Sequence, residues 1–257
     1  MCGRFLLTAP VEALQRLFGF PELPNLSARF NVAPGQAVAA MRLDSERRRH
    51  FVWLRWGLVP SWAQGNGAKG SGEGVVQSGR GITPLINARA ETVAEKPSFR
   101  AAFRQRRCVV FADGFYEWRQ DGNRQPYCVR LAETAPFAFA AVWEPLAPGT
   151  HQGAYQGAGD AATGEVAGTC ALITTQANDK MAVVHHRMPV ILPPEAVGPW
   201  LDPASGQGDL FPLLRPLPAA AVALTPVSKR VNAVREDDAG LLEESVLPEA
   251  PAQLKLI

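Results

Sequence analysis

The residue with the most distinctive chemistry in this 257-residue chain is Cys2, which becomes the terminal residue when Met1 is removed. An amino-terminal cysteine carries two nucleophiles, because its α-amine has a pKa of about 7.7–8 and its thiol a pKa of about 8.5. The amine can form an imine with an aldehyde, and the thiol can then close the imine to a thiazolidine ring in an effectively intramolecular step. Gly3 lets a ligand approach closely because it lacks a Cβ. The competing interpretation is that Met-Cys-Gly is an ordinary chain start.

Three further polar residues could assist such chemistry. The amide of Asn87 could donate to a developing negative charge on oxygen, or it could cap the following segment. Glu117 stands among aromatic residues after an Asp-Gly turn, where a carboxylate resists ionisation and suits proton transfer; a solvated edge-strand glutamate is the alternative. His185 and His186 fall in a segment expected to be extended, so their rings should point to opposite faces. Such a pair is poorly placed to bind a metal ion together, and one of the two rings could act in acid–base catalysis.

Aromatic and basic residues could contact a nucleic acid. Arg89 and Arg187 could hold phosphates, and a tryptophan such as Trp62 could stack on bases, worth about 1–3 kcal/mol each. Trp53 is expected to pack in the core, and for Trp56 both core packing and base stacking remain open. The net charge of only +2 does not by itself indicate nucleic-acid binding. Any basic surface must come from local clusters, and a solvated charged face is the alternative for them; the candidates are Arg47–Arg49 and the set Arg100, Arg104, Arg106 and Arg107.

Composition excludes several other classes of protein. No apolar stretch of eighteen or more residues is present and the amino end lacks a secretory signal, so we expect a cytoplasmic protein without a membrane span. Cys108, Cys128 and Cys170 lie in apolar runs without CxxC spacing, which indicates reduced core thiols. The chain has four histidines, none paired with cysteine at ligand spacing, so no metal ion and no cofactor is expected.

Many short strand-like runs with few helices predict an α+β fold, a single domain with an antiparallel barrel-like β core flanked by short helices. The expected strands are 38–43, 51–56, 108–112, 115–118, 126–131, 137–143, 169–174, 189–192 and 221–227, and the expected helices begin near 10, 97, 194 and 209. Residues 30–35 are predicted as a loop. The glycine-rich stretches 64–81 and 148–168 are predicted as surface insertions in a domain spanning 1–235, with a C-terminal tail over 236–257.

Several blocks, taken in order, resemble the SOS-response-associated peptidase (SRAP) family, which senses abasic sites in single-stranded DNA. The resemblance runs from residue 2 to about 235. The blocks are Met1–Phe5, Arg29–Gly35, Trp56–Pro60, Ile86–Thr92, Phe111–Trp118, His185–Pro189 and Pro226–Lys229.

The resemblance implies a covalent DNA–protein cross-link formed by Cys2 after Met1 is removed. At the matching positions Asn87 would orient the Cys2 terminus and the opened sugar, Glu117 would shuttle protons, and His185 would help to open the deoxyribose ring. Residues expected to contact DNA or line the site are Arg4, Asn31, Trp62, Arg89 and Arg187. The implied partner is abasic single-stranded DNA, bound by a monomer that joins the nucleoid at damaged DNA. A lyase-like strand nick and self-removal of Met1 by a peptidase activity are implied as side activities.

Two positions depart from the family pattern. His186 stands where relatives often carry an aspartate, which leaves open what orients His185 and which histidine acts. Ala63 follows Trp62 where another bulky aromatic can occur, so Trp62 would be the only side chain here that wedges between bases. Two rival classes remain open: an amino-terminal-nucleophile amidohydrolase, in which Cys2 attacks an amide, and a non-catalytic single-strand-binding module using the same arginines and tryptophans.

Overall fold

The computed structural model describes residues 2–64, 77–78, 81–146 and 165–246. The predicted insertions, 64–81 and 148–168, lie for the most part outside these residues. Two short paired strands, β5 (Gln77–Ser78) and β6 (Gly81–Ile82), lie at the carboxyl end of the first insertion, and β6 extends one residue beyond it. Residues 166–168, predicted to end the second, instead begin a core strand.

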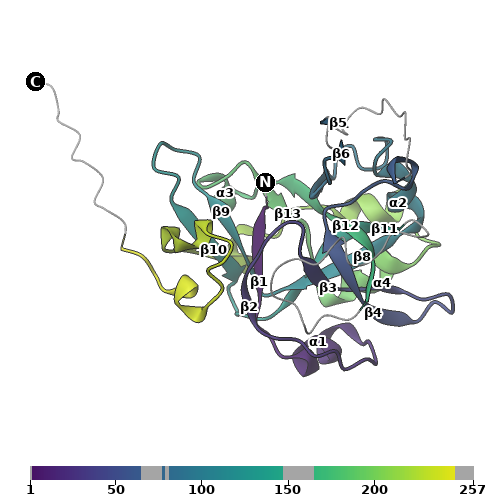
Figure 1. Cartoon of the computed structure of the whole chain (residues 1–257), viewed down its shortest axis with the longest axis horizontal. Coiled ribbons are helices and arrows are strands. Elements are labelled where there is room, and N and C mark those ends of the chain that lie inside the picture. The colour runs from purple at the N-terminus through teal and green to yellow at the C-terminus, as the bar shows by residue number, and fades with distance from the viewer. Residues whose placement is uncertain (1, 65–76, 79–80, 147–164, 247–257) are drawn as a thin grey trace, which may run out of the picture.

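A closed barrel forms the centre of the molecule (Figure 1). Its strands follow the order β12–β4–β3–β8–β11 and return to β12, and every pairing is antiparallel except the parallel one between β4 and β12. They are β3 (Ala37–Leu43), β4 (Arg49–Trp56), β8 (Arg107–Ala112), β11 (Phe137–Pro145) and β12 (Val166–Gln176). All of β8 and most of β11 are buried, which explains why both read as unbroken apolar runs. The predicted barrel-like core is confirmed.

A second, antiparallel sheet packs against the barrel. Its order is β15 (Val222–Pro226), β10 (Pro126–Leu131), β9 (Gly114–Trp118), β1 (Arg4–Leu7) and β2 (Arg29–Val32). Phe5 of β1 contacts Trp56 of β4, with ring centroids 5.2 Å apart, and Phe115 of β9 joins the same apolar cluster. This packing fixes β1, and with it the amino end of the chain, against the barrel.

Short helices cover the remaining apolar surface. They are α1 (Val11–Phe18), α2 (Arg100–Gln105), α3 (Asp179–Ala182), α4 (Pro194–Leu201) and α5 (Gln207–Leu210). Single 3-10 turns occur at Ser61–Ala63, Phe211–Leu213, Ala219–Ala221, Lys229–Asn232 and Ala239–Leu242. α1 ends at Gly19, whose φ of 66° is favoured by glycine, as its position after the apolar stripe predicts. None of the described helices is long and apolar enough to cross a bilayer.

The carboxyl half of β12 leaves the barrel and binds two short strands. β7 (Asn87–Arg89) pairs with it in parallel, Leu172 opposite Asn87, and β13 (Arg187–Pro189) pairs antiparallel, Gln176 opposite Arg187. β14 (Ile191–Leu192) then returns to β11. Three distant segments carrying predicted site residues are therefore held along one strand.

The prediction of a loop over residues 30–35 is wrong in its first half, because Phe30, Asn31 and Val32 belong to β2. β2 was missed because it is an edge strand of four residues, two of them buried, which is too short for a clear alternation.

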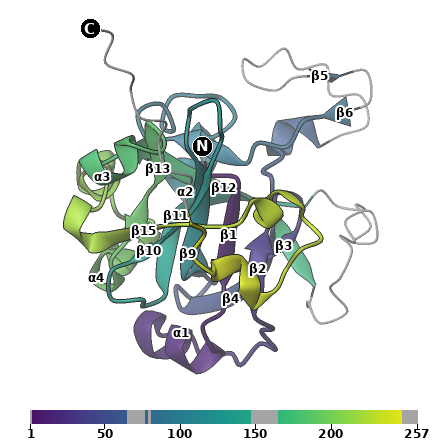
Figure 2. The same ribbon diagram turned by 90° about the vertical axis from the view of Figure 1, so that its left-hand side faces the viewer.

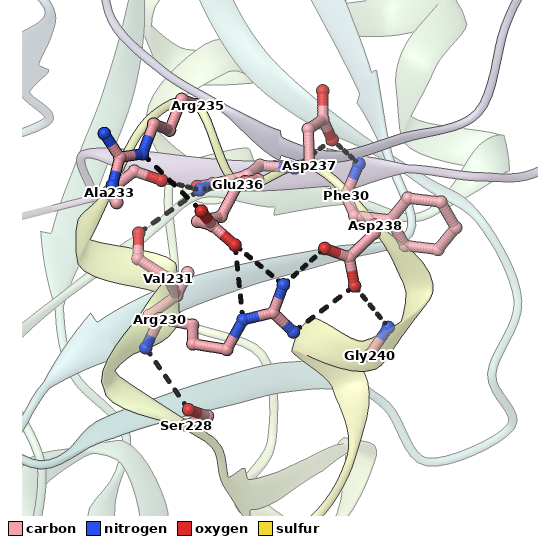
Figure 3. A network of polar contacts seen from close by, with 11 residues as sticks. Phe30, Ser228, Arg230, Val231, Ala233, Arg235, Glu236, Asp237, Asp238 and Gly240 are labelled. Carbon is pink, nitrogen blue, oxygen red and sulfur yellow. Dashed lines mark hydrogen bonds and ion pairs between the residues drawn. The ribbon is translucent and has the colours of Figure 1, made fainter.

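Residues 236–246, expected to begin the C-terminal tail, pack against the β1–β2 edge of the second sheet (Figures 1 and 2). Figure 3 shows the Arg230 guanidinium between the Glu236 and Asp238 carboxylates, with nitrogen–oxygen distances of 2.7 and 2.6 Å. Asp237 accepts the backbone N–H groups of Phe30 and Asn31 at 2.5 and 2.9 Å. These acidic residues are therefore partners of β2 and of the preceding turn.

Candidate active site

Cys2 lies just before β1 with no exposed surface. Its thiol contacts the carbonyl oxygen of Arg4 at 3.8 Å, and its own carbonyl accepts a hydrogen bond of 2.8 Å from Asn87 Nδ2. Burial raises the pKa of the thiol, and the nearby Glu117 carboxylate adds to the effect. The thiol is therefore kept protonated, and a reaction at Cys2 needs a group to accept that proton.

Asn87 opens β7, where pairing with Leu172 fixes its backbone. Its Nδ2 reaches Cys2, while its Oδ1 is buried without a hydrogen-bond partner among the described residues. A buried amide oxygen left unpaired costs about 1–3 kcal/mol, so this atom is ready to accept a donor from a ligand. The side chain bridges Cys2 and does not cap the following segment.

Glu117 lies on β9 with 2% of its surface exposed. β1 runs antiparallel to β9 with Arg4 opposite Tyr116, and one more step of this register brings Glu117 alongside Gly3. Burial raises the pKa of Glu117. The solvated-edge alternative is excluded, and the carboxyl group is poised for proton transfer.

His185 follows α3 and is 7% exposed. Burial lowers its pKa to about 4. Its Nδ1 lies 2.9 Å from the backbone nitrogen of Arg187 and 3.2 Å from the Arg187 carbonyl oxygen, so the Arg187 backbone holds this edge of the ring. The expectation that His185 and His186 point to opposite faces is wrong: their rings stack, with centroids 4.4 Å apart. The reason is local, since the His185 N–H continues the α3 turn by donating to Met181 O and the segment is not extended.

The structure brings together all four residues predicted to do chemistry. Asn87 bonds to Cys2, and Glu117 is among the charges acting on the Cys2 thiol. The positive charge at the amino terminus of the chain acts on the pKa values of Cys2, Glu117 and His185 alike. Figure 1 marks the amino end beside β13 and the start of β1. Among the residues that the structure describes, no group of His, Cys, Asp or Glu could hold a metal ion.

The residues predicted to contact DNA fall into two groups. Arg89 is exposed on β7, and Trp62 is 41% exposed, whereas Ala63 beside it is buried. Trp56 is fully buried, and its indole N–H donates to Ile86 O at 2.9 Å, so it packs in the core. Arg89 and Trp62 are therefore available to a ligand, but Trp56 is not.

The other three predicted contacts are engaged within the protein. Arg187 is buried and donates to both carboxylate oxygens of Glu91 at 2.6 and 2.9 Å. Asn31 is fully buried, where its Nδ2 donates to three carbonyls of the 231–236 segment and its Oδ1 accepts from Arg4 at 3.0 Å. Arg4 is half-buried and also donates to Val231 O at 2.7 Å. Asn31 and Arg187 thus hold elements in place, and only Arg4 also reaches an open surface.

That surface is an open groove of about 490 Å³ next to β1 and β9. It is lined by Arg4, Trp118, Asn123, Arg124, Lys229 and Asn232. The Trp118 indole N–H donates to Asn232 Oδ1 at 2.7 Å, and Lys229 Nζ donates to Asn123 Oδ1 at 2.8 Å. Three cations and an aromatic ring from distant segments meet here, a combination that suits a nucleic-acid strand. No local sequence pattern indicates this groove, because its cations are more than a hundred residues apart.

The two basic clusters predicted from sequence differ: Arg100, Arg104 and Arg107 line a pocket of about 230 Å³, whereas the cluster at Arg47 and Arg48 is ion-paired. Arg47 pairs with Asp202 at 2.6 Å and Arg48 with Asp44 at 2.9 Å. Arg106 pairs with Glu144 at 2.7 Å, and Arg107 is buried. The alternative of a solvated, ion-paired face holds for Arg47 and Arg48.

The family to which this chain belongs follows from its similarity to known proteins. The sequence profile described as SOS response associated peptidase (SRAP) matches residues 1–234, and the chain belongs to this family. It is 35% identical over 254 residues to the abasic site processing protein YoaM of Bacillus subtilis (strain 168), covering 95% of this chain and 98% of that protein. The abasic site processing protein YedK of Escherichia coli (strain K12) is 27% identical over 252 residues, covering 95% of this chain and 99% of that protein. A crystal structure of a protein from Bacteroides thetaiotaomicron matches with a TM-score of 0.72 at 22% identity, covering 95% of this chain and all of that one, which supports the fold.

Proposed function

We propose that this protein captures the aldehyde of an abasic site in single-stranded DNA through Cys2, once Met1 has been removed. The observation that carries the proposal is the 2.8 Å hydrogen bond by which Asn87 holds the Cys2 backbone, next to a buried Glu117. Relatives covering nearly the whole chain are named abasic site processing proteins, which supports the same substrate.

Each of the four residues has its own role in the proposed reaction. The Cys2 amine attacks the aldehyde carbon of the opened sugar, and loss of water gives an imine. The thiol sulfur then adds to the imine carbon while its proton passes to the nitrogen, closing the thiazolidine. Glu117, whose pKa burial raises, accepts and returns protons in these steps. His185 donates a proton to the sugar oxygen as the closed hemiacetal opens, and Asn87 Oδ1 accepts a donor from the opened sugar.

We assign the DNA path to the exposed cations and aromatic residues near the site. Arg89 and Trp62 would contact the strand on the β7 side, and the groove with Arg4, Trp118 and Lys229 would hold its phosphates on the β1–β9 side. The protein would act as a monomer in the cytoplasm and join the nucleoid at damaged DNA. The imine intermediate would also permit a lyase-like nick, because it acidifies the adjacent sugar carbon. Self-removal of Met1 would be the only peptidase step required.

The test is a denaturing gel of the protein incubated with uracil-containing single-stranded DNA that has been treated with a uracil glycosylase. A heat-stable shifted band is expected with the native sequence, and mass spectrometry should show protein plus DNA minus one water. Cys2→Ala should abolish the band, while Cys128→Ala, a matched change at another buried free cysteine, should retain it. If Met1 is absent by mass spectrometry and no band forms, the proposal fails. Salt-sensitive binding without a covalent product would then indicate a passive single-strand binder.

A further inference from the structure

A pocket between α2 and the segment that joins α4 to α5 contains three arginines that the proposed chemistry does not use. Its volume is about 230 Å³. Its lining includes Arg100, Arg104 and Arg107 together with Phe103, Ser205 and Leu210. Figure 1 shows α2 on the opposite side of β12 from the amino end of the chain. The pocket is therefore separate from the candidate active site.

Arg107 is the buried member of this set, and backbone carbonyls hold its guanidinium. Its Nε donates to Trp200 O at 2.6 Å, and its Nη2 donates to Asp202 O at 2.5 Å. Its Nη1 donates to Phe103 O at 2.8 Å and to Arg104 O at 3.0 Å. The group also lies 5.9 Å from the centroid of the Trp200 ring. A guanidinium carries five N–H groups, so one N–H on Nη2 has no acceptor among the residues that the structure describes.

Arg100 and Arg104 lie one helical turn apart on α2, so their side chains share one face of the helix. Both residues are exposed, and within the described part of the chain neither guanidinium forms a hydrogen bond or an ion pair. Like charges at this spacing destabilise a helix slightly. Neither helix formation nor an internal ion pair therefore explains why two arginines stand here.

No carboxylate compensates the positive charge inside the pocket, as far as its described lining shows. Asp202 is engaged by Arg47 at 2.6 Å, and Asp209 accepts the backbone N–H of Gly206 at 3.0 Å. Burial lowers the pKa of Arg107, and the Asp202 charge opposes this effect. A bound anion would offset the cost of the buried guanidinium.

We propose that this pocket binds a terminal phosphate group, the doubly charged end of a phosphate monoester. Such a group carries a charge of about −1.5 to −2 at pH 7. That charge matches the two exposed guanidiniums of Arg100 and Arg104, whose planar forks can each donate two hydrogen bonds to phosphate oxygens. The remaining N–H of Arg107 supplies a further donor. An internal phosphodiester carries a single charge and continues as chain on both sides, which fits a closed pocket less well.

The volume sets the part of the ligand that the pocket encloses. About 230 Å³ is smaller than the roughly 300 Å³ at which pockets begin to bury a whole drug-sized molecule. The phosphate enters, and the group that carries it stays at the rim beside Arg100 and Arg104. The phosphate can belong to a free nucleotide or to the 5′ end of a DNA strand.

The test is isothermal titration calorimetry of the full chain with inorganic phosphate, with deoxyadenosine 5′-monophosphate and with deoxyadenosine. One site per chain is expected for the first two compounds and none for deoxyadenosine. Arg100→Gln and Arg104→Gln should each raise Kd by about tenfold or more, which corresponds to one lost charge-assisted hydrogen bond. Arg16→Gln makes the same change of charge at an exposed arginine of α1 and should leave Kd unchanged. Lys229→Ala, which alters the other cationic groove, should also leave it unchanged.

Thermal unfolding distinguishes binding from a structural role of the two exposed arginines. Without phosphate, Arg100→Gln and Arg104→Gln should keep the native Tm or raise it slightly, because one of two repelling charges is gone. Phosphate should raise the Tm of the native protein more than that of either variant. A marked fall in Tm of both variants without phosphate would show that these arginines serve the fold, and it would overturn the inference.

Three calorimetric results would overturn it as well: no binding of phosphate, equal Kd values for Arg104→Gln and Arg16→Gln, or loss of binding in Lys229→Ala. Single-stranded oligonucleotides with a 5′-phosphate or a 5′-hydroxyl then identify the source of the group. An Arg104-dependent preference for the phosphorylated strand supports a DNA end, and equal binding of both strands with retained binding of the mononucleotide supports a free nucleotide. No measurement here uses abasic DNA, so this inference and the proposed function fail separately.

Discussion

The side-chain amide of Asn87 donates a 2.8 Å hydrogen bond to the carbonyl oxygen of Cys2, joining residues 85 positions apart. Because β12 fixes Asn87 through β7, the first residues of the chain are anchored to the barrel by a side chain. The amino end of the chain is thus positioned by an element that lies far from it in sequence.

Asn87→Ala should slow covalent capture of abasic DNA by about 5- to 150-fold, the equivalent of one buried hydrogen bond worth about 1–3 kcal/mol. Single-turnover rates on denaturing gels measure this. Asn87→Asp is the matched variant, since it keeps the shape but puts an acceptor opposite the Cys2 carbonyl. A native rate in both variants would show that the bond does not position Cys2.

Glu117→Gln should slow cross-linking while raising stability at neutral pH. Burial raises the folded-state pKa of Glu117, so its stabilising effect is full below the unfolded pKa of about 4.3 and is lost as pH rises through the folded pKa. Tm values of both proteins at several pH values check this. The difference in favour of the variant should grow with pH, and a constant difference would contradict the raised pKa.

His185 should make the protein less stable in mild acid. Its folded-state pKa of about 4 lies below the unfolded value of 6.5, so between these values the unfolded chain binds the extra proton. Its contribution to stability is complete above pH 6.5 and falls as pH drops toward 4. In His185→Gln the free energy of unfolding should change less over this window, and equal slopes for the two proteins would contradict the prediction.

Glu91→Gln should destabilise the fold by about 1–3 kcal/mol, because it leaves the buried Arg187 guanidinium without its two-point partner. Glu46→Gln is the control, since its pair with Arg48 at 2.7 Å is exposed on both sides and should cost less than about 1 kcal/mol. Urea denaturation midpoints measure both. Equal losses would mean that the Arg187 pair is no more than a surface contact.

Removal of one groove cation should weaken binding to undamaged single-stranded DNA and lower the salt slope by about 0.7 per lost phosphate contact. Lys229→Ala and Arg124→Ala test the groove, and Arg47→Ala, which breaks a pair with Asp202, is the control. Fluorescence anisotropy over a salt series gives the slopes. Identical slopes in all three variants would place the DNA elsewhere.

The barrel strands were predictable because their residues are apolar, β-branched and aromatic over runs long enough to identify. β3, β4, β8, β11 and β12 all fall where such runs occur. β2 and β7 were not predicted, because three or four residues that depend on a neighbouring strand carry no pattern of their own. The acidic residues after 235 were expected to form a tail because their own sequence carries no pattern. Their partners lie on β2 and in the preceding turn.

The sequence by itself determined which side chains could react, because a cysteine next to the start, an amide, a carboxyl group and an imidazole have intrinsic chemistry. Only the tertiary structure decided their state: burial raises the pKa values of the Cys2 thiol and of Glu117 and lowers the pKa of His185. It also decided which arginines remain available, leaving Arg89 exposed and enclosing Arg187 against Glu91. Desolvation and pairing depend on neighbours from distant segments, and a linear pattern does not contain them.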